Sequence, residues 1–347
     1  MSKPAIETTA QALVPPGKGI LAADESHPSI AKRFEALGIE NTAETRRVYR
    51  QMLFTTPGIA EYISGVILFD ETIRQKADDG SPFAEVLARQ GIVPGIKVDR
   101  GAKVLAGAPG ELVTEGLDGL HDRLAEYAGL GARFAKWRAV ITIGPGLPGR
   151  PDLPTRACLE ANAHALARYA ALCQGAGLAP IVEPEVLMDG DHPIERCEAV
   201  TTEALHVVFD ALHRQGVVLE GMLLKPNMVL SGKTCPRQAP PREVAAATVR
   251  CFLRTVPAAV PGIVFLSGGQ SDEVATANLD AINRLPGSRP WPLSFSYGRA
   301  LQAPAQKAWR GDPTRIAAGQ QALYLRARLN AAARRGAYAP EMERAVA

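Results

Sequence analysis

One lysine in this sequence stands where a lysine is costly to bury. Lys225 ends an apolar run in the stretch LEGMLLKPNMVL, residues 219–230, and Pro226 follows it directly. Burial in an apolar strand and neighbouring cations both favour the neutral form of a lysine. A neutral amine can attack a carbonyl carbon and form a Schiff base, whose iminium then withdraws electrons. Lys225 is therefore a candidate nucleophile for carbonyl chemistry.

Acidic and basic side chains that could serve this chemistry end other apolar runs. Asp24 follows ILAA, Glu183 and Glu185 lie in IVEPE, and Lys136 and Arg138 lie in FAKWR. Residues two apart on a strand point the same way, so each of the last two pairs shares a face. A single charged strand end is most simply a solvated loop start. That explanation weakens when nearly every strand carries one, and carboxylates so placed can move protons.

Two glycine-rich segments have the composition of a phosphate site. FLSGGQ contributes Ser267 and Gly268, and FSYGR contributes Gly298 and Arg299. Backbone N–H groups and a guanidinium are the usual protein partners of a phosphate. Together with Lys225, these segments indicate a phosphorylated carbonyl compound as the substrate.

Eight short, nearly continuous apolar runs must position these side chains. They cover residues 17–26, 63–70, 92–99, 132–140, 178–186, 219–227, 262–270 and 292–298. Such runs are typical of parallel strands buried on both faces. Helical patterns lie between them, among others at 155–174, 193–216 and 271–287. The alternation predicts an α/β fold, a (β/α)8 TIM barrel with its chemistry at the C-terminal strand ends. A doubly wound sheet is the competing architecture.

The composition limits the partners and the compartment. The net charge of +3 comes from mixed signs along the chain, so we expect no nucleic acid partner. No apolar run has the length of a signal peptide or a membrane span. Five cysteines without CxxC spacing are typical of reduced thiols, and we expect a cytoplasmic protein. We expect one domain over residues 1–347, ending in a short mobile tail from about residue 337.

Three further patterns are weaker signals. GPGLPG fits GxGxxG literally but holds two prolines and opens no helix. The segment SGKT at residues 231–234 matches the end of a phosphate-binding loop, but Asn227 stands where its first glycine should be. Asp189, Asp191 and His192 could suggest a metal, yet no paired-histidine spacing accompanies them. We therefore expect neither a metal nor another cofactor.

The motifs taken together resemble one family. In order they are ILAADES, GVILFDETIRQKADDG, GIKVDRG, FAKWR, IVEPEVLMDGDH, LEGMLLKPNMV, FLSGGQS and FSYGRALQ, and they reach to about Pro340. The chain is similar to the class I, Schiff-base fructose-bisphosphate aldolases. This resemblance implies reversible cleavage of fructose 1,6-bisphosphate to dihydroxyacetone phosphate and glyceraldehyde 3-phosphate, in glycolysis or gluconeogenesis, by a metal-independent homotetramer. Sedoheptulose 1,7-bisphosphate and fructose 1-phosphate stay open as the main substrate.

The resemblance also implies a role for each candidate residue. Lys225 matches the Schiff-base lysine, and Asp24 matches the aspartate that takes the proton of the C4 hydroxyl. Glu183 matches the proton shuttle of carbinolamine dehydration, with Glu185 beside it, and Lys136 matches the second active-site lysine. The substrate contacts that it implies are Arg138, Lys97, Ser26, Ser29, Ser267, Gly268, Gly298 and Arg299, the last four around the ketone-side phosphate. A noncatalytic barrel and a metal-dependent lyase are the rival hypotheses.

The chain departs from the family pattern at two places. Thr-Gly usually follows the ADES motif, whereas His27 and Pro28 stand here, and proline stiffens a loop that glycine leaves mobile. Many members end in a tyrosine, but this chain ends EMERAVA. Tyr338 lies close behind the last helix, and we expect it to anchor that helix rather than to reach the active site.

Overall fold

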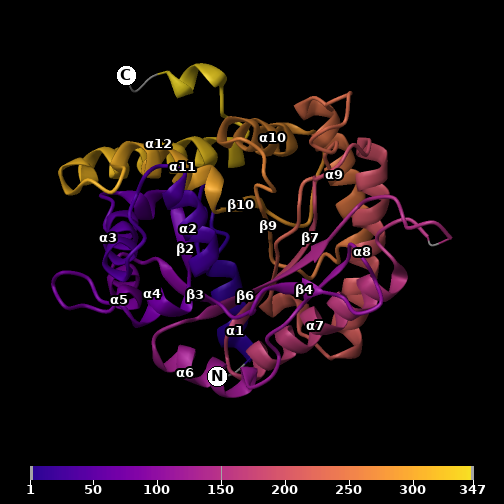
Figure 1. Ribbon diagram of the computed structural model, residues 1–347, viewed down its shortest axis with the longest axis horizontal. Helices are drawn as coiled ribbons and strands as arrows, with labels where there is room; N and C mark the ends of the chain where they lie inside the picture. The colour runs from indigo at the N-terminus through magenta and orange to yellow at the C-terminus, as the bar shows by residue number, and fades with distance from the viewer. Residues whose placement is uncertain (1–2, 150, 345–347) are drawn as a thin grey trace.

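Eight parallel strands close into a barrel in the computed structural model, which describes residues 3–149 and 151–344 (Figure 1). In the order in which they pair around the barrel, the strands are β1 (Gly19–Ala23), β10 (Leu293–Tyr297), β9 (Ile263–Phe265), β8 (Leu223–Leu224), β7 (Ala179–Val186), β6 (Phe134–Ile141), β3 (Val93–Lys97) and β2 (Ile63–Leu68). Pairing of β1 with both β2 and β10 closes the sheet. The predicted TIM barrel is confirmed, and the doubly wound sheet is wrong.

The strand that carries Lys225 is much shorter than predicted. A 3-10 helix occupies Leu219–Gly221, where a Cβ on Gly221 would lie 2.8 Å from the Ile6 side chain. The strand proper is only Leu223–Leu224, although the Lys225 amide still donates to the Val182 carbonyl at 2.8 Å. Pro226 has no N–H to donate, although its carbonyl still accepts from the Leu266 amide at 3.1 Å.

Helices cover the outside of the barrel. They are α1 (Lys3–Ala12), α2 (His27–Glu35), α3 (Ala43–Phe54), α4 (Asp70–Arg74), α5 (Phe83–Arg89), α6 (Leu120–Gly129), α7 (Arg156–Gly175), α8 (Ile194–Arg214), α9 (Pro241–Thr255), α10 (Asp272–Arg284), α11 (Arg299–Trp309) and α12 (Ile316–Arg334). The helical patterns at 155–174, 193–216 and 271–287 are confirmed as α7, α8 and α10. The hydroxyls of Thr155 and Ser271 cap α7 and α10 by accepting from backbone N–H groups.

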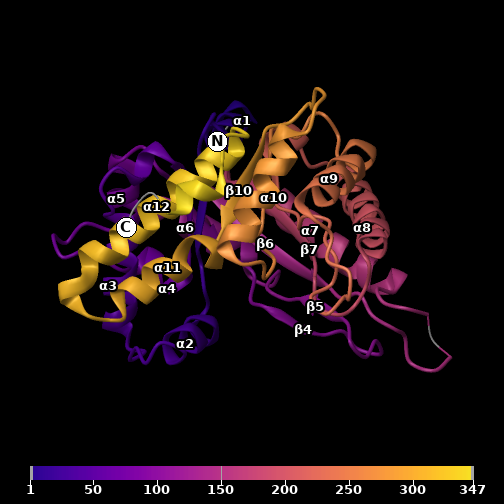
Figure 2. The ribbon, with the colours of Figure 1, turned by 90° about the horizontal axis from the view of Figure 1, so that it is seen from above.

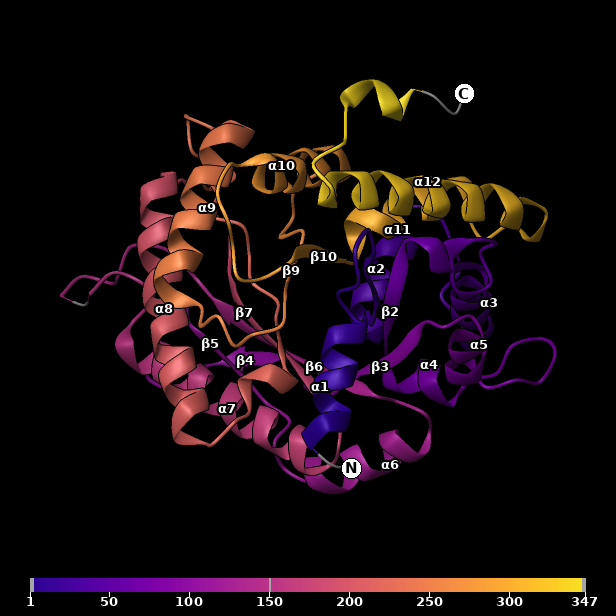
Figure 3. The same ribbon diagram turned by 180° about the vertical axis from the view of Figure 1, so that it is seen from behind.

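The N-terminal end of the barrel is filled with apolar side chains. The helix α1 lies against the barrel (Figure 3), and Leu13 just after it is fully buried. A Cβ on Gly65 would lie 2.5 Å from the Leu13 side chain, and one on Gly95 would lie 2.3 Å from the Phe134 ring. These glycines leave room for bulky neighbours inside the barrel. The filled end leaves the polar chemistry to the C-terminal strand ends.

The last helix and the segment after it pack on the outside of the barrel. Figure 2 shows α12 beside α11, and α12 also contacts α10 and α3. Beyond α12, Tyr338 is buried and a 3-10 helix covers Pro340–Glu343. The buried Arg326 guanidinium donates to both carboxylate oxygens of Glu343, at 2.6 and 2.5 Å. Residues 345–347 lie outside the described part, and the mobile tail stays a prediction.

A small antiparallel hairpin follows β3. Its strands are β4 (Ala102–Val104) and β5 (Leu112–Thr114). Three residues per strand carry too little periodicity for the sequence to reveal them. None of the described helices is long and apolar enough to cross a lipid bilayer.

Candidate active site

A cavity of about 250 Å³ opens among the C-terminal strand ends, and every predicted catalytic or substrate-binding residue lines it. The predicted residues on its wall are Asp24, Ser26, Ser29, Lys97, Lys136, Arg138, Glu183, Glu185, Lys225, Ser267, Gly268, Gly298 and Arg299. The structure thus brings together side chains that the sequence spreads over 276 positions, from Asp24 to Arg299. Their individual roles remain predictions.

Two lysines and two carboxylates meet at the bottom of this cavity. The ammonium of Lys136 lies 2.7 Å from Asp24 Oδ2 and 3.2 Å from Glu183 Oε2. The amine of Lys225 lies 3.3 Å from the other Glu183 oxygen, Oε1. Both lysine side chains and Glu183 are 4% exposed, and Asp24 is 13% exposed. The carboxylate of Glu183 therefore bridges the two lysines, in reach of any group bound to Lys225.

The contact between Lys136 and Asp24 shifts the pKa of both groups. Burial alone would raise the pKa of Asp24, but the charges of Lys136 and Lys225 lower it well below its usual value. Burial alone would lower the pKa of Lys136, but Asp24 and Glu183 raise it well above its usual value. Asp24 is thus held as a carboxylate and Lys136 as an ammonium. A protonated amine has no free lone pair, so Lys136 is a poor nucleophile.

A second layer of charges surrounds this centre. Arg138 Nε donates to Glu185 Oε2, and the Arg138 amide donates to Asp99 Oδ2 at 3.2 Å. Burial would lower the pKa of Arg138, but Glu185 raises it above its usual value. Lys97 Nζ lies 2.6 Å from Asp99 Oδ1. These pairs hold β3, β6 and β7 in register at the mouth of the barrel.

The glycine-rich segments form one wall of the cavity. Gly268 and Gly269 have φ of +56° and +87°, which an L side chain rarely adopts. Their turn follows Ser267, which is 8% exposed. Across from it, α11 begins at Arg299 with Gly298 as its N-cap. A helix N-terminus offers unpaired N–H groups to an anion, and the Arg299 guanidinium adds a charge.

The opposite wall is the start of α2. The hydroxyls of Ser26 and Ser29 are 3.1 Å apart, and both side chains line the cavity. His27 and Pro28, which depart from the family pattern, form the first turn of α2. His27 Nε2 lies 2.9 Å from Glu71 Oε2 on α4. His27 thus joins the start of α2 to α4, and Ser29 still lines the cavity.

Comparisons with known proteins identify the family of this chain. The model of the glycolytic class-I fructose-bisphosphate aldolase family matches residues 5–347. This chain belongs to the class I fructose-bisphosphate aldolase family. A probable class 1 aldolase of Xanthomonas campestris pv. campestris is 61% identical, over 97% of this chain and 99% of that protein. The fructose-bisphosphate aldolase of Drosophila melanogaster is 55% identical, over 95% of this chain and 90% of that protein.

A solved structure of a family member has the same fold. It is the Plasmodium falciparum fructose-bisphosphate aldolase in complex with TRAP and a small-molecule inhibitor. The two chains are 49% identical and superimpose with a TM-score of 0.94, over 97% of this chain and 95% of that chain. The agreement extends through the whole aldolase barrel.

Sequence reasoning missed the ion network behind the first strand of this aldolase-family barrel. Glu25, 8% exposed, lies 2.6 Å from Arg50 Nη2 and 2.5 Å from Arg33 Nη1, and Gln302 Nε2 donates to it at 2.8 Å. Burial would raise the pKa of Glu25, but the two arginines lower it. The network ties β1 to α2, α3 and α11. Its only local signal was the charge of Glu25 directly after Asp24.

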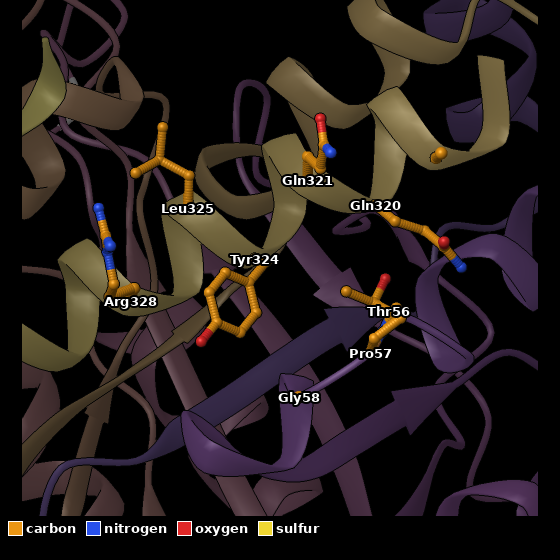
Figure 4. Close-up of a pocket in the computed structure, with 9 residues that line it drawn as sticks. Thr56, Pro57, Gly58, Gln320, Gln321, Tyr324, Leu325 and Arg328 are labelled. Carbon is orange, nitrogen blue, oxygen red and sulfur yellow. The ribbon is translucent and has the colours of Figure 1, made fainter. Parts of the chain in front are cut away.

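A larger cavity lies elsewhere and has a different character. It measures about 620 Å³ and lies between Thr56–Gly58 and α12 (Figure 4). Among the residues described on its wall, Arg328 is the one with a formal charge. Buried titratable groups with specific partners mark functional sites better than volume does. The smaller, charged cavity is therefore the candidate active site.

Proposed function

We propose that this chain cleaves fructose 1,6-bisphosphate reversibly through a Schiff base on Lys225. The observation that carries the proposal is the difference between the two buried lysines. Lys136 lies between Asp24 and Glu183, which hold its proton, whereas Lys225 has one carboxylate ion-pair partner among the described residues, Glu183 at 3.3 Å. The amine best suited to attack is therefore that of Lys225.

The geometry supports an ordered sequence of proton transfers. Lys225 attacks the C2 carbonyl of the open-chain sugar. Glu183, 3.3 Å from the Lys225 nitrogen, accepts the protons that this nitrogen loses and passes them to the C2 oxygen, which leaves as water. Asp24, held as a carboxylate, takes the proton of the C4 hydroxyl. The C3–C4 bond then breaks, its electron pair moves to the iminium to form an enamine, and glyceraldehyde 3-phosphate leaves. Protonation at C3 and hydrolysis release dihydroxyacetone phosphate and restore the amine.

The walls of the cavity suit the two phosphates. The turn at Ser267–Gly268 and the α11 N-terminus with Arg299 would bind the ketone-side phosphate. Ser26, Ser29 and Lys97 on the opposite side would bind the other one, with Lys97 turning away from Asp99. A bisphosphate fits this arrangement better than a monophosphate does. Comparing kcat/KM for fructose 1,6-bisphosphate, fructose 1-phosphate and sedoheptulose 1,7-bisphosphate tests that preference.

The assembly and the compartment are further parts of this proposal. We propose a homotetramer because the motifs of the class I aldolases imply one. We propose a cytoplasmic location because a relative 53% identical to this chain is the cytosolic aldolase 4 of Arabidopsis thaliana. Light scattering during gel filtration measures the assembly directly. A mass near that of one or two 36.9 kDa chains would contradict the tetramer.

Borohydride trapping tests the mechanism. Reduction in the presence of dihydroxyacetone phosphate should inactivate the enzyme and add the mass of the triose phosphate to the peptide that contains Lys225. A label on Lys136 or Lys97 would overturn the assignment.

Treatment with a strong chelator should leave the rate unchanged, because the iminium does the work of a metal ion. Loss of activity that zinc restores would favour the rival metal-dependent lyase.

A further inference from the structure

Two loops beside the glycine-rich wall of the cavity are joined by backbone hydrogen bonds. They follow β7 and β8, and so both lie at the mouth of the barrel. The Lys233 amide donates to the Met188 carbonyl at 2.7 Å, and the Gly232 amide donates to the His192 carbonyl at 2.8 Å. A Cβ on Gly232 would lie 2.3 Å from the Gly190 carbonyl oxygen. This close approach fixes the backbone position of Lys233.

The side chain of Lys233 reaches the glycine-rich wall at Gly269. A Cβ on Gly269, which lines the cavity, would lie 3.2 Å from Lys233 Nζ and 3.4 Å from Arg299 Nη2. Two cations therefore converge on one turn. Lys233 Nζ also lies 2.8 Å from Asp189 Oδ1. Arg299 has no carboxylate partner among the residues that the structure describes.

The ion pair of Lys233 is weakly held. Its side chain is 44% exposed and that of Asp189 is 60% exposed. An ion pair so open to water contributes little, because solvent screens both charges. A phosphate dianion at the turn would carry more charge than the carboxylate and would also bind Arg299. Exchange of Asp189 for phosphate would therefore be favourable.

We propose that Lys233 binds the ketone-side phosphate alongside Arg299, and that Asp189 competes with the phosphate for it. The inference rests on the proposed function, because it names a further contact of the same substrate. It also explains the SGKT segment. The segment forms no nucleotide-binding loop, yet its lysine serves a phosphate at the neighbouring turn.

Variants at the two positions test the proposal because they should act in opposite directions. Lys233→Met keeps the stem and removes the charge, and should weaken dihydroxyacetone phosphate binding by about three- to tenfold. Asp189→Asn frees the lysine and should tighten that binding by about two- to threefold. In Lys233→Met/Asp189→Asn the tightening should disappear. Calorimetric titration measures the dissociation constants, and Lys233→Arg should restore the affinity.

The controls separate this contact from a general charge effect. Lys307, exposed near the far end of α11, offers the same loss of charge, and Lys307→Met should change affinity by less than about twofold. If Lys233→Met and Asp189→Asn shift the affinity in the same direction, or neither shifts it, Lys233 only ties the loops and the proposal is wrong. If the wild-type enzyme is not trapped by borohydride, the proposed function fails instead. Titration with inorganic phosphate then tests Lys233 by the same opposite signs.

Discussion

The side chains at the bottom of the active-site cavity are paired with opposite charges, whereas Arg299 at its rim is not, within the described part of the chain. At the bottom, the inner cluster of Asp24, Lys136, Glu183 and Lys225 is buried and contains equal numbers of acids and bases. At the rim, Arg299 is exposed and has no carboxylate partner among the described residues. Each acid of the inner cluster already faces a base, whereas Arg299 gains an anionic partner only when a phosphate binds.

This difference separates the two energetic tasks of the enzyme. Buried charges that already compensate each other need no rearrangement during the reaction, and so stabilise developing charge effectively. The unpaired Arg299 at the rim attracts and orients a dianionic group, which supplies binding energy away from the reacting carbons. Changes at the bottom should therefore reduce kcat, and changes at the rim should chiefly raise KM.

The largest loss should follow removal of the nucleophile. Lys225→Met keeps the length of the stem but cannot form an iminium, so cleavage should fall to background, at least about a thousandfold. Borohydride with dihydroxyacetone phosphate should add no mass to the variant. Lys136→Met is the matched control, because it removes the other buried lysine and leaves Lys225 free to be trapped. Trapping that survives in Lys225→Met would refute the assignment.

Substitutions of the two carboxylates of the inner cluster should block different steps of the reaction. Each substitution should lower the cleavage rate about a hundred- to ten-thousandfold, the usual contribution of a general acid or base. Asp24→Asn should block C–C cleavage while trapping of dihydroxyacetone phosphate continues. Glu183→Gln should slow trapping itself, because loss of water from the carbinolamine needs an acid. The opposite pattern in a trapping time course would mean that the two roles are exchanged.

A substitution at the rim should chiefly weaken substrate binding. Arg299→Ala removes a charge-assisted contact of about 1.5–3 kcal/mol, and so should raise KM for bisphosphates about ten- to a hundredfold. For unphosphorylated fructose, which should be cleaved slowly, the same substitution should change the kinetics much less. Steady-state kinetics on both sugars give the ratio. Equal losses would show that Arg299 only supports the start of α11.

Local pattern was enough to find the barrel and most of the site. Strands buried on both faces have an apolar signature, and the polar residue that ends each one is visible in the sequence. Since a barrel gathers those ends, Asp24, Glu183 and Lys225 could be placed together without coordinates. The short β8 strand was missed because a 3-10 helix and a proline bound it without breaking the apolar run.

Long-range partners had no local signal. Glu25 meets Gln302 across 277 positions, and no periodicity connects them. Lys233 comes beside Gly269 only because the loops after β7 and β8 pair through their backbones. Such contacts depend on the closed fold, so charge and spacing alone cannot reveal them.

The C-terminal segment provides a third environment, away from both the bottom and the rim. The Tyr338 amide donates to Asp280 at 2.9 Å, and its hydroxyl donates to Glu343 at 3.0 Å. Glu343 also accepts from Arg326, whose side chain is 3% exposed. Burial and the Glu343 carboxylate raise the pKa of Tyr338 well above its usual value. These contacts are those of an anchor for α12, and a hydroxyl so held donates its proton reluctantly.

The smallest effect on catalysis should therefore come from shortening the chain. Removal of residues 341–347 should change the cleavage rate by less than about tenfold, which is under ~1.4 kcal/mol in activation free energy. It should lower the free energy of unfolding by about 1–3 kcal/mol, because the buried Arg326 loses a charged partner but keeps Thr276 and the Asp272 carbonyl. Glu343→Gln should reproduce most of that loss, and Tyr338→Phe a smaller part, in denaturant titrations. Selective loss of proton exchange on bound dihydroxyacetone phosphate, with trapping intact, would instead make this segment part of the catalytic machinery. Its contacts with Arg326 and Asp280 would then have to open in every turnover.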